Sequence, residues 1–503
     1  MYIVRSDIMA FTKGMEQKTT YYTERYRPQF HFTPEANWMN DPNGMVYYEG
    51  EYHLFYQYHP HSLKWGPMHW GHAISRDMVH WEHLPIGLEP DELGTIFSGS
   101  AVVDWNDTSG LFQGKSGLVA IFTHTKDELQ RQSIAYSHDK GRTWIKYAGN
   151  PVIENLGIKD FRDPKVFWHE ETNRWVMVLA AGQKVMFYSS TNLLKWEFVS
   201  EFGSCDGAHG GVWECPDLFE LPVDGNPNQK KWVLQVDLGD GSVAGGSGGQ
   251  YFLGTFDGKT FLNDHAPSEI LWLDYGKDFY ATQSFSDIPE EDGRRIWMAW
   301  MSNWKYANDV PTFPWRSAMS FPREVELKTM SDGQVKLVQK PIREIETIRT
   351  EIVKIANEVG RECDNLLADV QETLFEIEAE IELLTASEFG FKLRKSGMEQ
   401  ETLVGYDVEK QVLVVDRDCS GEHDFSEHFK GSNIVNLPLT NGMLKLRILV
   451  DTSSVEVFAN EGEIALTNLI FPDKEGQDVE LYVKGGEVNV ISLNLYRLKT
   501  TWR

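Results

Sequence analysis

The sequence predicts an all-β protein in which a five-bladed β-propeller is followed by a β-sandwich, and three observations lead to this prediction. A short motif recurs four times in the first two thirds of the chain. Five polar positions precede apolar strand segments at similar intervals. The last third contains closely spaced alternating strands with turns at glycine. A length of 503 residues is sufficient for two domains of unequal size, each with its own core.

The recurring motif consists of a short apolar strand, a small hydroxyl residue, a turn with Asp, Asn or Gly, and an aromatic residue. The aromatic residues that close the four copies are separated by 63, 52 and 65 residues. Such a spacing is close to the length of one four-stranded propeller blade with long loops. The four copies span residues 75–81, 137–144, 189–196 and 255–261.

A second series of polar residues marks the start of each predicted blade. Its members are Asp41, Ser98, Asp163, Glu214 and Tyr280, separated by 57, 65, 51 and 66 residues. The innermost strand of every blade lines the propeller axis, so equivalent blade starts converge on one mouth. The series therefore predicts five blades, and it predicts that Asp41, Asp163 and Glu214 meet although they are far apart in the chain.

Antiparallel hairpins fill the intervals between these positions. Apolar segments 45–48 and 52–56 flank a Glu-Gly-Glu turn, and segments 166–168 and 175–179 flank a second polar turn. Consecutive hairpins of this kind are typical of propeller blades.

The composition changes after Pro341. An acidic, helix-compatible stretch at 342–357 is followed by alternating strands such as 444–450 and 455–458, in which we expect Glu456 to lie on an exposed face. Turns at glycine separate these strands, a pattern typical of a β-sandwich. We therefore expect an N-terminal tail at 1–25, the propeller at 26–341, a linker at 342–357 and the β-sandwich at 358–503.

The composition also limits the class of partner. The chain has 48 Lys and Arg against 75 Asp and Glu, and its net charge of −27 repels phosphate backbones and anionic membranes. We therefore expect neither nucleic acid nor a membrane as a partner. A neutral substrate is unaffected by this charge, and the 17 Trp, 19 Tyr and 27 Phe supply flat faces that pack against sugar rings. The composition favours a carbohydrate substrate.

Neither a targeting segment nor a metal site is expected. The first 30 residues contain charged side chains and no apolar run of seven, so we predict no secretory leader and a cytoplasmic location. No stretch of the sequence is long and apolar enough to predict a membrane span. The four cysteines form no C-x-x-C pair, and the histidines between 53 and 72 lack a ligand spacing, so we expect no metal and no cofactor.

Two acids have the sequence environment of a glycosidase pair. A retaining glycosidase needs two carboxyl groups about 5 Å apart, one ionised and one protonated. Asp41 lies in the segment WMNDPNG, whose amide side chains can hydrogen-bond a carboxylate and keep it ionised, as a nucleophile requires. Glu214 lies between Trp213 and Cys215, and we expect desolvation there to favour the protonated acid.

Further residues have features of a sugar-binding site. Arg162 precedes Asp163 and favours an anion there, which suits the binding of two sugar hydroxyls in the transition state. Trp65 and Trp315 adjoin Gly or Pro on predicted loops, a position that favours ligand contact over the core.

Four motifs, WMNDPNG at 38–44, FSGS at 97–100, FRDP at 161–164 and WECPD at 213–217, resemble the signatures of glycoside hydrolase family 32, the invertase, inulinase and levanase family. The resemblance covers nearly the whole chain and is greatest to bacterial levanase-type exo-β-fructosidases. It implies a five-bladed propeller followed by a β-sandwich, with Asp41 as nucleophile, Glu214 as acid/base and Asp163 as transition-state stabiliser. It also implies a substrate pocket formed by Asn40, Gln57, Trp65, Phe97, Ser98, Arg162, Tyr280 and Trp315.

The resemblance implies a retaining exo-β-fructosidase that acts on levan, inulin and sucrose. Many extracellular relatives carry a signal peptide, so the resemblance alone allows an extracellular location as well. A fructosyltransferase that uses the same covalent intermediate stays open, as does a non-catalytic sugar-binding propeller, although the latter would be expected to lack an essential acid. A sialidase is disfavoured because only Arg162 lies within a motif, and an acidic sugar requires several arginines.

Overall fold

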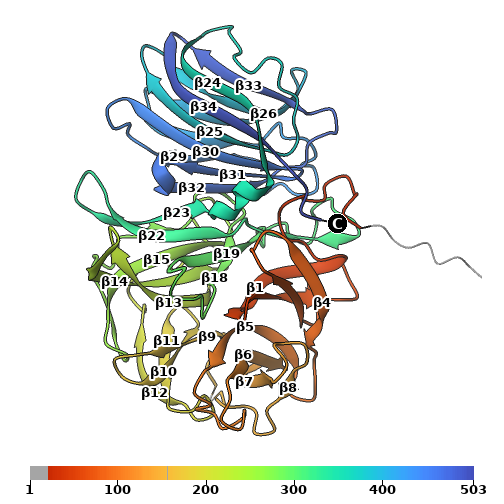
Figure 1. Ribbon diagram of the computed structural model, residues 1–503, viewed down its shortest axis with the longest axis vertical. Coiled ribbons are helices and arrows are strands. Elements are labelled where there is room, and N and C mark those ends of the chain that lie inside the picture. Colours follow the sequence, from red (N-terminus) through yellow and green to blue (C-terminus); the bar gives the residue numbers. More distant parts are fainter. Residues whose placement is uncertain (1–20, 156, 503) are drawn as a thin grey trace, which may run out of the picture.

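The computed structural model describes residues 21–155 and 157–502, and its regular structure is almost entirely β-strand (Figure 1). The all-β prediction is confirmed. Residues 1–20, on which the expectation of no secretory leader depends, lie outside the described residues. Within the described part, no helix is long and apolar enough to cross a membrane.

The first three sheets are antiparallel meanders in chain order. The first comprises β1 (Asn37–Tyr48), β2 (Glu51–His59), β3 (His69–Ser75) and β4 (Trp81–Leu88), with β20 (Trp315–Arg316) parallel to β1. The second comprises β5 (Thr95–Asp104), β6 (Gly117–Lys126), β7 (Leu129–Ser137) and β8 (Ile145–Lys146). The third comprises β9 (Phe161–His169), β10 (Arg174–Ala181), β11 (Val185–Ser190) and β12 (Glu197–Phe202).

A larger sheet contains two further antiparallel sets, joined by one parallel pairing of Val223 with Leu327. One set comprises β13 (Trp213–Val223), β14 (Asn226–Leu238), β15 (Gly248–Phe256), β16 (Phe261–Asn263) and β17 (Leu271–Trp272). The other comprises β18 (Tyr280–Ser284), β19 (Arg295–Met301), β21 (Ala318–Met319), β22 (Arg323–Thr329) and β23 (Val335–Pro341).

The recurring sequence motif forms the turn between the third and fourth strands of a meander. In three copies the indole nitrogen donates a hydrogen bond to the backbone carbonyl three residues earlier, at 3.1, 3.0 and 2.9 Å for Trp81, Trp144 and Trp196. The repeat in the sequence thus corresponds to a repeated local structure. In the third copy the hydroxyl that caps the turn belongs to Ser190, one residue later than the sequence motif predicts.

The first strands of the five antiparallel sets surround a common centre. Strands β1, β5, β9, β13 and β18 contact one another in a closed cycle, and in Figure 1 the strands coloured red to green lie around this centre. Nearly every residue of β1 is buried, because neighbouring sheets cover both of its faces. The topology thus brings together residues that are far apart in sequence.

Two antiparallel sheets form the C-terminal part, drawn in cyan to blue in Figure 1, and they share one hydrophobic core. The first sheet has the order β24 (Arg349–Arg361), β34 (Glu487–Leu498), β25 (Phe375–Leu383), β30 (Met443–Asp451), β31 (Ser454–Ala459) and β32 (Ile464–Leu469). The second has the order β29 (Ser432–Asn436), β28 (Val412–Asp416), β27 (Gln400–Asp407), β26 (Glu388–Ser396) and β33 (Asp478–Lys484). A 3-10 turn, η2 (Asn460–Gly462), follows β31.

The expected linker at 342–357 is wrong over most of its length. A 3-10 helix, η1 (Arg343–Ile348), is followed directly by β24, which pairs antiparallel with β34. Ile352, Val353 and Ile355 pack against the core of the C-terminal sheets, and β-branched residues favour a strand wherever a partner strand is available. Of the acidic residues in this stretch, Glu344 and Glu346 belong to η1, and Glu351 lies exposed on the edge strand β24.

The interface between the two parts buries Glu456, which was expected on an exposed face. Its carboxylate is fully buried and contacts His31 at 2.7 Å, the Phe321 backbone N–H at 2.9 Å, and Arg323. The N-terminal segment and β22 cover the side of β31 that the alternation pattern indicated as exposed. The ion pair with Arg323 and the hydrogen bond to His31 lower the pKa of Glu456 to about 2, against the opposing effect of burial, which is the largest single influence.

Candidate active site

Each of the five central strands has an irregular register where a predicted site residue lies. The register shifts fall at Asn40 and Asp41 in β1, at Ser98 in β5, after Arg162 in β9, after Glu214 in β13 and after Tyr280 in β18. A β-bulge adds a residue to one strand and redirects its side chain. The bulges thus turn side chains from different sheets toward the centre of the ring.

Side chains at four of these five bulges, in β1, β5, β9 and β13, line a cavity of about 310 Å³. Nine of the eleven predicted site residues contribute to its wall, and three further residues complete it. The lining residues are Asn40, Asp41, Gln57, Trp65, Phe97, Ser98, Gln130, Asp160, Arg162, Asp163, Glu214 and Trp304.

Asp41 is held by hydrogen bonds to both carboxylate oxygens. The Ser98 hydroxyl donates to Oδ2 at 2.6 Å, and the Asn40 amide donates to Oδ1 at 3.0 Å. Asn40 is fixed in turn because its own Oδ1 accepts a hydrogen bond of 2.7 Å from the Trp38 indole. Burial raises the pKa of Asp41, and the hydrogen bonds from Ser98 and Asn40 act in the opposite direction. These hydrogen bonds fix the orientation of the Asp41 carboxylate, which forms part of the cavity wall.

Glu214 has different partners from those that the sequence suggested. Arg162 donates to its Oε1 from Nε at 3.1 Å and from Nη2 at 2.8 Å, while the Tyr280 hydroxyl donates to Oε2. Its side chain is 21% exposed. Trp213 does not desolvate this carboxyl, because its indole is buried in the core between sheets and donates to the Ala208 carbonyl at 2.9 Å.

Cys215 also turns away from Glu214. Its thiol lies 3.5 Å from Oδ2 of Asp41 and 3.7 Å from Oδ2 of Asp163, because the bulge after Glu214 reverses its side chain. Its φ of 46° lies in the left-handed region, as expected for a residue within such a bulge. The expected apolar environment of Glu214 is therefore wrong, and an arginine and a tyrosine take its place.

Asp163 shares one contact partner with each of the other two acids, Cys215 with Asp41 and Arg162 with Glu214. The Cys215 backbone N–H donates to its Oδ2 at 3.0 Å, and Nε of Arg162 lies 3.9 Å from the same oxygen. Burial is the largest influence and, together with the Glu214 and Asp41 carboxylates, raises the pKa of Asp163 to about 7 against the effect of Arg162. Arg162 does favour the anion, as expected, but burial outweighs its effect. Near neutral pH Asp163 can both donate and accept hydrogen bonds.

Two predicted pocket residues do not line the cavity. Tyr280 is 1% exposed and reaches the site only through its hydroxyl on Glu214. Trp315 is 2% exposed and lies behind the wall, with the Arg27 guanidinium 3.9 Å from its ring centre. Its strand β20 pairs with β1, a long-range pairing that removes the indole from the surface.

Three lining residues were not predicted, namely Gln130, Asp160 and Trp304. Asp160 accepts a hydrogen bond of 2.8 Å from Nη1 of Arg162, and Oε1 of Gln130 lies 3.3 Å from the same nitrogen. Asp160 directly precedes the FRDP motif, and this position in the sequence could have indicated that it belongs to the site. Gln130 carries no such indication, because it belongs to a hairpin outside every motif.

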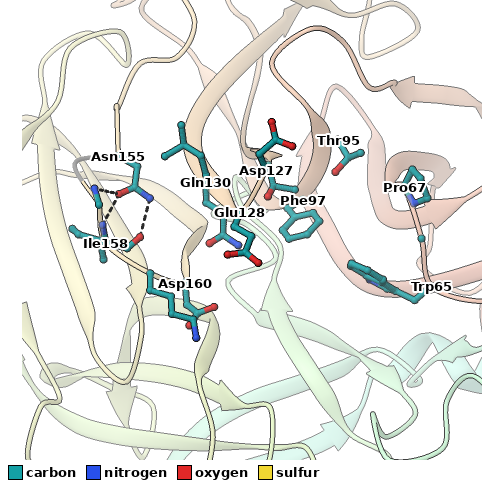
Figure 2. A pocket seen from close by; sticks show the side chains of 15 residues that line it. Trp65, Pro67, Thr95, Phe97, Asp127, Glu128, Gln130, Asn155, Ile158 and Asp160 are labelled. Atoms are coloured by element: carbon teal, nitrogen blue, oxygen red, sulfur yellow. Dashed lines mark hydrogen bonds between the residues drawn. The ribbon is translucent and has the colours of Figure 1, made fainter.

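A groove of about 790 Å³ continues from the cavity and shares Trp65, Phe97, Gln130 and Asp160 with it. In Figure 2, Trp65, Pro67, Thr95 and Phe97 form one side and Asn155, Ile158 and Asp160 form the other, with Asp127, Glu128 and Gln130 between them. Trp65 is 46% exposed and marks the junction of groove and cavity. The arrangement provides a small cavity for one ring and a larger adjoining groove for a chain attached to it.

The described residues contain no group of three or more His, Cys, Asp and Glu side chains arranged to hold a metal ion.

Comparison with known proteins identifies the family. Residues 31–341 match the description "Glycosyl hydrolases family 32 N-terminal domain", and residues 344–497 match "Glycosyl hydrolases family 32 C terminal". A levanase of Bacillus subtilis (strain 168) is 60% identical over 98% of this chain and 73% of its own length. An extracellular exo-inulinase of Aspergillus awamori is 41% identical over 96% of both chains. The crystal structure of the exo-inulinase from Aspergillus awamori superposes with a TM-score of 0.87 at 39% identity, covering 96% of this chain and all of the other.

Proposed function

This chain belongs to glycosyl hydrolases family 32, and on that basis we propose that it is a retaining exo-β-fructosidase that removes terminal β-D-fructofuranosyl units from levan, inulin and sucrose. The observation that carries the proposal is the pairing of two differently held acids in one small cavity. Asp41 is fixed by two neutral donors, whereas Glu214 is contacted by an arginine and a phenol.

In the first step the Asp41 carboxylate attacks the anomeric C2 of the terminal fructosyl unit. The bond from C2 to the glycosidic oxygen breaks, and Glu214 gives its proton to that oxygen, so the leaving group departs as a neutral alcohol. A covalent fructosyl-enzyme results. In the second step Glu214 takes a proton from water, the oxygen attacks C2, and the Asp41 carboxylate is released. Two inversions at C2 give net retention.

Asp163 stabilises the transition state by hydrogen bonds to two hydroxyl groups of the fructosyl ring. Its carboxyl faces the same cavity as Asp41 and Glu214, and a group whose pKa is near 7 can exchange the roles of donor and acceptor with sugar hydroxyls. Ser98, Asn40 and Gln57 complete the polar wall, and Trp65 and Phe97 contribute its apolar part.

Exo-attack follows from the dimensions of the site. The cavity is less than half the volume of the groove, so it suits the terminal unit, while the groove accommodates the leaving part of the chain. An enzyme that cut within a chain would need an open surface on both sides of the acids. The same cavity accepts the fructosyl half of sucrose, with the glucosyl half at the beginning of the groove.

We further propose that the ring of five central strands represents a propeller of five blades over residues 26–341, with the β-sandwich beginning at β24. The meeting of the two family matches between residues 341 and 344 supports a boundary there. The expected cytoplasmic location stays a prediction, and the exo-inulinase of Aspergillus awamori is named as extracellular.

A time course of levan and inulin digestion tests this function. Free fructose should be the first and main product, and nuclear magnetic resonance should detect the β-anomer before mutarotation. Early accumulation of oligosaccharides would contradict exo-attack, and early α-fructose would contradict retention. With sucrose at high concentration, a fructosyltransferase would accumulate longer sugars, whereas the proposed hydrolase should accumulate fructose and glucose in equal amounts.

A further inference from the structure

The C-terminal sheets reach the active site through a segment that precedes β18. Residues 274–278 lie along β32, the edge strand of the six-stranded sheet. The Tyr275 backbone N–H donates to the Ala465 carbonyl at 2.8 Å, and the Asp278 N–H donates to the Thr467 carbonyl at 3.1 Å. A Cβ on Gly276 would lie 2.1 Å from the Thr467 carbonyl oxygen, so only glycine permits this approach. Residues 274–278 thus hydrogen-bond to the edge strand β32 as a further strand would.

Arg417, from the loop after β28, joins this segment to a second one. Its Nη1 donates to Oδ2 of Asp278 at 2.5 Å, and its Nη2 donates to the Tyr306 hydroxyl at 2.9 Å. The Tyr306 hydroxyl in turn donates to Oδ1 of Asp278 at 2.6 Å. Arg417 and Asp278 are completely buried, and Tyr306 is 1% exposed. The three side chains form a closed polar cluster whose arginine belongs to the C-terminal sheets.

Both segments held by this cluster carry residues of the active site. Two residues after Asp278, the Tyr280 hydroxyl donates to Oε2 of Glu214. Two residues before Tyr306, Trp304 lines the catalytic cavity. Asn303 also links the two segments, because its amide donates to the Lys277 carbonyl at 2.8 Å. One arginine outside the catalytic part of the chain therefore anchors two elements of the site.

We propose that Arg417 is a positioning residue for the acid/base step: by fixing Asp278 it holds the Tyr280 hydroxyl on Glu214, and by fixing Tyr306 it holds Trp304 at the cavity wall. The inference rests on the proposed function, since it assigns Glu214 the role of proton donor. It gives the C-terminal sheets a part in catalysis that does not require contact with the substrate.

The test compares substrates that differ in their need for acid catalysis. Departure of the glucosyl group of sucrose needs a proton from Glu214, whereas departure of a nitrophenolate from an aryl β-fructofuranoside needs little help. Arg417→Met should lower kcat/KM for sucrose about tenfold, and that for the aryl substrate less than about threefold. Arg394→Met is the matched control, because Arg394 is another buried arginine of the C-terminal sheets, bonded to the carbonyls of Gly476 and Thr452. It should leave the ratio of the two rates unchanged.

Tyr306→Phe provides a second variant that removes one hydroxyl and little volume, in case Arg417→Met does not fold. It should shift the ratio in the same direction by a smaller factor. A double-mutant cycle identifies the route: in the Tyr280→Phe background, Arg417→Met should lose most of its effect on the ratio, because the two changes interrupt one chain of contacts.

Equal losses of kcat/KM on sucrose and on the aryl substrate would overturn the inference. Independent effects of Arg417→Met and Tyr280→Phe on the ratio of the two rates would overturn it as well. Either result would leave Arg417 with a purely structural role. Failure of the unmodified enzyme to hydrolyse sucrose would instead overturn the proposed function, so the two failures are distinguishable.

Discussion

The hydroxyl of Ser98 donates a hydrogen bond of 2.6 Å to Oδ2 of Asp41, although the two residues belong to different sheets and are 57 positions apart. This bond lowers the pKa of Asp41 against the effect of burial, so it favours the ionised form that the proposed role of nucleophile requires.

Ser98→Ala should therefore raise the pKa of Asp41. A hydrogen bond to a charged group contributes about 2 kcal/mol, which corresponds to a shift of about one pH unit or more. Since Asp41 must be ionised to attack, the acid limb of kcat/KM should move to higher pH, while activity at the optimum falls about tenfold. A pH–rate profile on sucrose measures this shift. An unchanged acid limb would show that Ser98 does not control the ionisation of the nucleophile.

Glu214→Gln should separate substrates by their need for a proton donor. The replacement removes the proposed proton donor but keeps the shape of the side chain and a donor for hydrogen bonds. The value of kcat/KM on sucrose should therefore fall by several orders of magnitude, whereas kcat/KM on an aryl β-fructofuranoside, whose leaving group needs little help from an acid, should fall much less. Equal losses on the two substrates would assign proton donation to a different group.

Replacement of groove residues should lower activity on polymers more than activity on sucrose. Leu129 and Ile158 line the groove but not the cavity, and their replacement by alanine removes apolar surface that a fructan chain can cover. The double variant should lose about 1 kcal/mol of binding, or about fivefold in kcat/KM, on levan or inulin. Sucrose serves as the internal control, because in the proposed binding mode its single glucosyl unit occupies only the beginning of the groove. An equal loss on all three substrates would contradict a chain-binding role for this groove.

The interface cluster around His31 should make stability depend on pH. Hydrogen bonds to Asp451 and Glu456 raise the pKa of His31 from about 6.5 to about 9, against the effect of burial, which is the largest single influence. A raised folded-state pKa means that the stabilisation is complete below about pH 6.5 and is lost as the pH rises through 9.

His31→Gln leaves the buried Asp451 carboxylate without its cation and leaves Glu456 with Arg323 alone, so it should destabilise the protein by about 3 kcal/mol at pH 6. Thermal unfolding should show a much smaller difference between the two proteins at pH 10. If the difference were as large at pH 10 as at pH 6, the contribution of His31 would come from packing and not from its charge.

Much of the site could be predicted from the sequence because the repeat itself specifies convergence. Asp41, Ser98, Asp163 and Glu214 each begin a repeated unit, and a ring of such units necessarily gathers their starts. The partners of Glu214 could not be predicted in this way. They depend on the bulge that turns Cys215 toward Asp41 and Asp163, and a bulge of one residue has no clear sequence pattern.

Burial by distant parts of the chain accounts for the remaining differences between the predicted and the observed positions of side chains. Trp315 adjoins a proline and resembles a loop residue, but its pairing with Asn37 places it behind the wall. Glu456 follows an alternating pattern that indicates one exposed face, but the N-terminal segment and β22 cover that face. Local alternation gives the orientation of a side chain in its strand and contains no information about a second sheet or segment that packs on top.

The assignment of Asp41 as nucleophile and Glu214 as acid/base is tested most directly by azide rescue. Glu214→Ala and Asp41→Ala are each given an activated aryl β-fructofuranoside, with and without azide, and the products are identified by nuclear magnetic resonance. In Glu214→Ala the covalent intermediate still forms, so azide should accelerate turnover and yield β-fructosyl azide of retained configuration. In Asp41→Ala no intermediate exists for azide to capture. Rescue of Asp41→Ala alone, or an inverted azide product from Glu214→Ala, would contradict the assignment.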